Sequence, residues 1–118
     1  MCLRFHQAFT DSLILEQLTK KDANFDVWNE TSIYHACIAY IGFNGKECAD
    51  AAKIRLDKYI EWAEAPLPEK KEGSSFGRPS AQYVRNQITK FNPMKEHIMT
   101  NNLNKEQILE YFDSLDDQ

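Results

Sequence analysis

Apolar side chains recur every three to four positions along most of this chain, a spacing typical of amphipathic α-helices. In the segment from Asp11 to Lys20, Ile14, Leu15 and Leu18 fall within one helical stripe of ~100°, and Leu13 widens it on one side. Thr10 stands where an N-cap residue is needed, and it precedes that segment directly. The pattern therefore predicts a helix over residues 11–20. The ten residues at the start of the chain fit a helix and a strand equally well.

The segment 30–43 has a broad apolar stripe. Asn29 precedes it as an N-cap residue, and Trp28 and Ile33 have the spacing of a hydrophobic staple. A stripe this broad predicts a central, mostly buried helix. Its members are Ile33, Cys37, Tyr40 and Ile41, with Tyr34 and Ile38 at its sides.

A second long amphipathic segment, 46–65, follows directly after Asn44 and Gly45. Glycine ends a helix without strain, and Pro66 is expected to stop the second helix. An Asn-Gly pair also suits a β-hairpin turn. The residues after it lack the two-residue alternation of a strand, so we expect an antiparallel αα-hairpin.

Residues 66–79 hold three of the four prolines and two of the four glycines, which predicts a mobile loop. The segment 80–118 is short for an independent core. We therefore expect the segments before and after the loop to pack into one common core. We expect residues 1–118 to form a single all-α domain, a helical bundle of about five helices built on the central antiparallel αα-hairpin.

After the loop, Ser80 can cap a helix that runs to Phe91. Proline lacks the backbone N–H of a helix interior, so Asn92-Pro93 is expected to break this helix. Pro93 then suits the first turn of a short helix that ends near Met99.

The last helix has a clear start. Asn104 and Gln107 have the spacing of a capping box, and Leu103 and Ile108 have that of a second staple. The acidic residues expected on its outer side are Glu106, Glu110 and Asp113.

The composition, 42% hydrophobic and 27% charged with a net charge of −4, is that of an ordinary soluble protein. The longest apolar run, Ala36–Ile41, is far shorter than the ~20 residues of a membrane span. The start of the sequence has no signal-peptide pattern, so a cytoplasmic location is expected. The odd cysteine count (Cys2, Cys37, Cys48) argues against a disulfide framework, and Cys37 and Cys48 are expected to be buried.

Charge on the second helix of the hairpin indicates the first candidate function. Its acidic side chains, with those of the last helix, can meet a basic protein partner, and complementary charge would speed that association. We therefore expect a small intracellular protein-binding module, an adaptor or inhibitor that acts by surface complementarity without catalysis. The predicted partner-binding residues are Asp50, Asp57, Glu61 and Glu64.

The alternative function is a nucleic-acid-binding regulator that uses the basic helix 80–91. Arg, Asn and Gln side chains can contact base edges, and Arg and Lys also bind phosphates. Against this, a long loop precedes the helix where a helix-turn-helix needs a short turn. The candidate contact residues are Arg78, Gln82, Arg85, Asn86, Thr89 and Lys90.

Catalysis has little support in the sequence. The histidines are scattered, no nucleophile lies in a recognisable motif, and no glycine-rich phosphate loop is present. His35 and Cys37 would point ~200° apart on a helix, a poor arrangement for a shared metal ion. We expect no catalytic residue, no metal and no cofactor, although residues distant in sequence can still form a triad.

Overall fold

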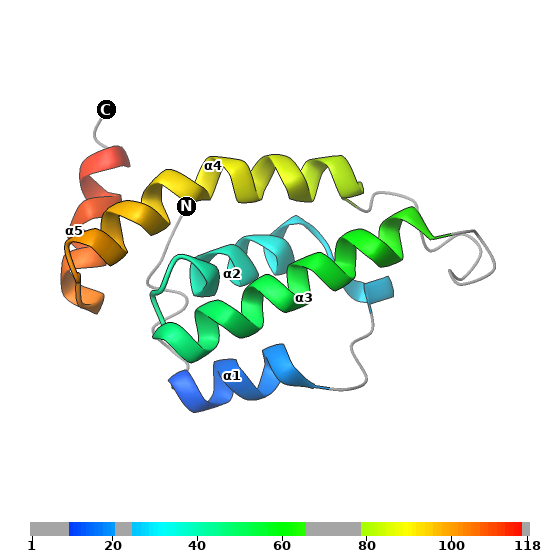
Figure 1. Ribbon diagram of the computed structural model, residues 1–118, viewed down its shortest axis with the longest axis horizontal. Coiled ribbons are helices and arrows are strands. Elements are labelled where there is room, and N and C mark those ends of the chain that lie inside the picture. Colours follow the sequence, from blue (N-terminus) through cyan, green and yellow to red (C-terminus); the bar gives the residue numbers. More distant parts are fainter. Residues whose placement is uncertain (1–9, 21–24, 66–78, 117–118) are drawn as a thin grey trace.

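The computed structural model describes residues 10–20, 25–65 and 79–116, and these residues form α-helices with no strand among them (Figure 1). This confirms the prediction of an all-α helical bundle. The predicted loop 66–79, apart from Pro79, and the first nine residues lie outside the described residues. The elements are α1 (Asp11–Thr19), the short 3-10 helix η2 (Phe25–Val27), α2 (Glu30–Tyr40), α3 (Lys46–Glu64), α4 (Ala81–Thr100) and α5 (Lys105–Asp116).

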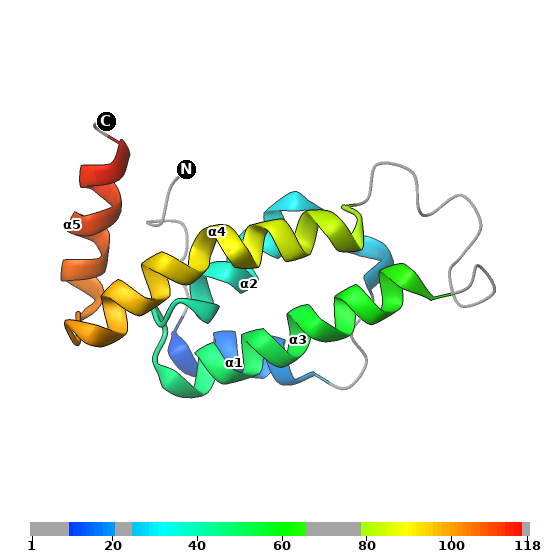
Figure 2. The same cartoon turned by 45° about the horizontal axis from the view of Figure 1, so that its top comes forward.

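The α2–α3 pair forms the centre of the bundle. α3 contacts α2, α1 and α4, and α4 also packs on α2 (Figures 1 and 2). α5 lies across the C-terminal end of α4, at one end of the molecule. None of the described helices has both the length and the apolar character needed to cross a bilayer.

Side-chain caps begin four of the helices as the sequence predicts. The side-chain oxygens of Thr10, Asn29 and Ser80 accept hydrogen bonds of 3.0–3.1 Å from the backbone N–H three residues on. The capping box before α5 is reciprocal. Asn104 N–H donates to Gln107 Oε1, and Gln107 N–H donates to Asn104 Oδ1, both at 2.9 Å.

The turn of the αα-hairpin differs from the prediction in one respect. α2 ends at Tyr40, before the expected residue 43, because Gly42 adopts φ +106° directly after the Ile41 C-cap. Gly45, with φ +95°, is instead the N-cap residue of α3. Each glycine supplies a left-handed conformation at its own end of the turn, so the chain reverses within five residues.

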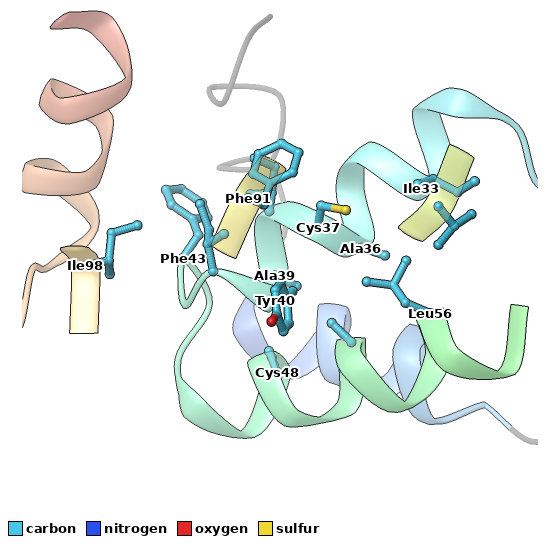
Figure 3. Close-up of a cluster of buried hydrophobic side chains, with 14 of the residues drawn as sticks. Ile33, Ala36, Cys37, Ala39, Tyr40, Phe43, Cys48, Leu56, Phe91 and Ile98 are labelled. Carbon is cyan, nitrogen blue, oxygen red and sulfur yellow. The ribbon is translucent and has the colours of Figure 1, made fainter. Parts of the chain in front are cut away.

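The core lies between α2, α3 and α4 (Figure 3). Ile33 and Cys37 on α2 and Leu56 on α3 are completely buried. Phe91 and Ile98 bring α4 onto the same cluster, and Figure 3 shows these side chains converging from separate helices. Cys37 and Cys48 are both buried and free, which confirms the prediction for these two thiols; Cys2 lies outside the described residues.

An aromatic cluster closes one end of this core. Trp28 and Trp62 both lie beside Tyr59, with ring centroids 5.5 and 5.4 Å from its ring. Phe25 makes an edge-to-face contact with Trp28 at 5.2 Å. The Tyr59 hydroxyl donates to the carbonyl oxygen of Pro79 at 2.7 Å. Both tryptophans therefore have structural roles.

The prediction that Pro93 breaks the helix is wrong. α4 runs without interruption from Ala81 to Thr100, with Pro93 in its interior. A proline in a helix interior costs about 3 kcal/mol. Burial of Phe91 on one side of it and Ile98 on the other offsets that cost, because a break would withdraw one of them from the core.

Candidate functional site

The predicted partner-binding carboxylates lie together on one exposed side of α3. Successive helix residues turn by ~100°, so these positions fall within an arc of ~60°. All four side chains are exposed. We call this surface the α3 acidic face, and it comprises Asp50, Asp57, Glu61 and Glu64.

Two members of the α3 acidic face are held by ion pairs. Lys53 Nζ lies 2.7 Å from Asp57 Oδ1, one turn earlier on the same helix. Arg85 on α4 lies 2.8 Å from Glu64 Oε1. All four side chains are about half exposed, so each pair contributes little to stability but restricts the position of its carboxylate. Among the described residues, Asp50 and Glu61 make no ion pair.

An isoleucine that sequence analysis did not single out lies at the edge of this face. Ile54 is 58% exposed, and among the described residues Val27, Met99 and Leu13 are exposed large apolar side chains as well. Ile54 is the one of these four that belongs to α3 and lies beside its carboxylates. It follows Asp50 by one helical turn and precedes Glu61 by two. At ~100° per residue it lies about 20° outside the arc of the carboxylates, which are all on one side of it, while exposed Lys58 is on the other. The sequence could have indicated this exposure, because Ile54 lies outside the apolar stripe of its own helix.

The acidic residues of the last helix do not extend the α3 acidic face. Glu106, Glu110 and Asp113 are exposed, but α5 lies across the end of α4, away from most of α3 (Figures 1 and 2). The two acidic surfaces therefore belong to different parts of the molecule.

The candidate nucleic-acid face on α4 is only partly available. Gln82, Asn86, Thr89 and Lys90 are exposed on α4, and the Gln82 amide donates to Asn86 Oδ1 at 3.0 Å. Arg85 is paired with Glu64, which places a carboxylate where a phosphate would have to bind. Arg78 lies outside the described residues.

A groove of about 360 Å³ between α1 and α2 is mainly apolar. Leu18 and Trp28 are among its apolar lining residues, and Gln17, Ser32 and His35 add polar atoms. Among the described residues that line it, His35 is the titratable one, and burial lowers its pKa.

Thiol and metal chemistry also lack a site in the described part of the chain. Burial raises the pKa of the Cys37 thiol to about 12, so the group stays protonated at neutral pH. Burial also raises the pKa of Cys48, whose Sγ donates to the carbonyl oxygen of Asp11 at 3.4 Å. Within residues 10–20, 25–65 and 79–116, no group of three or more His, Cys, Asp or Glu side chains is arranged to hold a metal ion.

Comparison of the chain with protein-family models, with curated proteins and with solved structures gives no match.

Proposed function

We propose that this protein is a protein-binding module, an adaptor or inhibitor, and that the α3 acidic face is its binding surface. The observation that carries the proposal is the exposure of Ile54 beside four carboxylates that share one side of α3. Neither catalysis nor a cofactor is part of this function.

The chemistry of the face specifies the partner. An apolar side chain that enters a pocket at the centre of an interface, with a polar rim around it, is the usual arrangement of a binding hot spot. Here Ile54 is the anchor, and the four carboxylates form the polar rim on one side of it. The partner is therefore a protein with a basic surface and an apolar pocket of isoleucine size.

The ion pairs of the rim neutralise the charge of two carboxylates and also fix their positions. Lys53 and Arg85 hold Asp57 and Glu64 in place, so these carboxylates lose less conformational freedom when a partner arrives. Asp50 and Glu61 remain available to pair with cations of the partner. Long-range attraction by this face should raise the association rate, and salt should lower it.

The test is affinity capture from the source cell with photocrosslinking from position 58, next to the face. The proposal is supported if one protein with a basic surface is crosslinked, if its capture survives nuclease treatment, and if salt weakens that capture. Ile54→Ser and Glu61→Lys should each reduce its capture, whereas Glu96→Lys on α4 is the matched control and should not. If the unmodified chain and the three variants capture the partner equally well, the α3 acidic face is not the binding surface.

A nucleic-acid-binding regulator is the second candidate. The support for it is that α4 carries no acidic residue from Ala81 to Lys95 and exposes Gln82, Asn86 and Lys90. The Glu64 carboxylate beside Arg85 disfavours it. It predicts binding of a duplex DNA or a single-stranded RNA probe that falls steeply with salt and weakens further in Lys90→Ala. No binding of either probe at low salt would discard it.

A further inference from the structure

A second groove, of about 610 Å³, lies between α1 and α3 and borders the α3 acidic face. Its two ends differ in charge. Glu47 and Asp50 line one end, and Lys20, Arg55 and Lys58 line the other. Arg55 follows Glu47 by eight residues and Asp50 by five, which corresponds to ~12 Å and ~7.5 Å along a helix axis. The cations of the groove therefore gather toward the end away from these carboxylates.

Arg55 is the central residue of the basic end. Its side chain is buried, with the residue only 5% exposed, although arginine is rarely buried without an anionic partner. Nε donates to the carbonyl oxygen of Leu18 at 2.8 Å, and Nη2 donates to that of Lys20. These bonds satisfy carbonyl groups at the C-terminal end of α1, where positive charge is favourable.

Those two bonds use only one edge of the guanidinium group. A guanidinium has a side edge, Nε with Nη2, and an end edge, Nη1 with the second hydrogen of Nη2. Among the described residues, no acceptor bonds to Nη1 and no carboxylate lies within ion-pair distance of Arg55. Burial of a cation without a counter-charge is costly. Desolvation lowers the pKa of Arg55, in agreement with that cost.

Two further cations line the same end. Lys58 lies one turn after Arg55 on α3, and Lys20 is the residue whose carbonyl Arg55 binds. Both lysine side chains are exposed, so they can turn toward a ligand in the groove. A fork of N–H donors beside two ammonium groups suits an anion with several oxygens and more than one charge.

We propose that the basic end of the α1–α3 groove is a binding site for a phosphate group. The end edge of Arg55 takes two phosphate oxygens, and Lys20 and Lys58 neutralise the remaining charge. A carboxylate has only two oxygens and one charge, so it engages fewer of these donors. The groove is also lined by Asp50 and Ile54 of the proposed protein-binding surface, but the phosphate site uses other residues and can be tested on the purified chain alone.

The test is calorimetric titration with inorganic phosphate, glycerol phosphate and acetate, with chloride used to keep the ionic strength constant. We expect saturable binding of phosphate, a higher melting temperature in its presence, and clearly weaker binding of acetate. Lys20→Gln and Lys58→Gln should each weaken phosphate binding about tenfold. Lys46→Gln, an exposed lysine of α3 outside the groove, is the matched control and should bind as the unmodified chain does.

Arg55→Lys keeps the positive charge but removes the paired N–H donors of the guanidinium group, so this variant should lose phosphate binding. If Arg55→Lys does not fold, Lys20→Gln and Lys58→Gln still test the proposal. Glycerol phosphate that binds as well as inorganic phosphate would identify a phosphate monoester as an acceptable ligand. If phosphate acts no more strongly than chloride or acetate, or if the glutamine variants bind it normally, the proposal is wrong.

Discussion

The ammonium group of Lys95 on α4 donates to the backbone carbonyl oxygen of Tyr40 at 2.9 Å and lies 4.2 Å from the centre of the same tyrosine ring. Tyr40 is the last residue of α2, so the cation meets the negative end of that helix. The Tyr40 hydroxyl donates to Asn92, almost one turn before Lys95. Two side chains of α4 therefore hold the end of α2 through one tyrosine.

Lys95→Met should lower the free energy of unfolding by about 1–3 kcal/mol, because it removes a charge-assisted hydrogen bond to a partly buried carbonyl group. Urea unfolding followed by circular dichroism measures the change. Lys90→Met on the exposed side of α4 is the control and should change stability by less than about 0.5 kcal/mol. Equal effects of the two substitutions would show that the contact with Tyr40 contributes nothing.

Pro93→Ala should stabilise the protein, by up to about 3 kcal/mol. The substitution restores a backbone N–H inside α4 that can bond the carbonyl oxygen of Thr89, and the exposed position allows it without loss of packing. Thermal unfolding of the variant measures the gain, with Glu96→Ala one turn later as the control. A lower melting temperature for Pro93→Ala would mean that the proline ring itself makes a necessary contact.

The features that sequence predicts correctly are those decided within a few residues. The caps at Thr10, Asn29 and Ser80 depend on a side chain and an N–H group three positions away. The apolar stripes of α2 and α3 are likewise local, and a stripe on each of two neighbouring segments is sufficient to predict their packing. For this reason the αα-hairpin and its buried cysteines could be predicted.

The features that sequence analysis missed depend on distant residues. Pro93 remains in a helix because Phe91 and Ile98 are both buried, and no local pattern reveals that. Likewise, the pairing of Arg85 with Glu64 joins residues from the two candidate surfaces only because α3 and α4 are adjacent. The exposure of Ile54 and the burial of Arg55 depend on which side of α3 is covered by α1, which periodicity alone does not specify.

Acid should weaken the contact between α1 and α5. Asp11 accepts hydrogen bonds from Lys105 at 2.7 Å and Asn44 at 3.0 Å. Burial alone would raise the pKa of Asp11, but these two bonds and the Lys105 charge together lower it below the ordinary value of 3.8. The unfolded chain thus takes up the proton first as the pH falls. The stabilisation is present above about pH 4 and is lost as the pH falls through the lowered pKa.

The corresponding measurement is the free energy of unfolding of the unmodified chain and of Asp11→Asn between pH 2 and 7. The unmodified chain should be more stable at neutral pH by less than about 1 kcal/mol, since the pair is half exposed and screened by water. The two curves should converge at low pH. A difference that stays constant over the whole range would contradict the ionic origin of this contact.

Cys37 and Cys48 should be unreactive toward a thiol reagent in the folded protein. Only the thiolate reacts, and burial raises the pKa of Cys37 to about 12 and also raises that of Cys48. Both side chains are shielded from a reagent of the size of dithionitrobenzoate. In a Cys2→Ser background the two thiols should react only after urea unfolding, and the rate should follow the unfolded population. Rapid reaction of either thiol without denaturant would show that the α2–α3 core opens locally, without global unfolding.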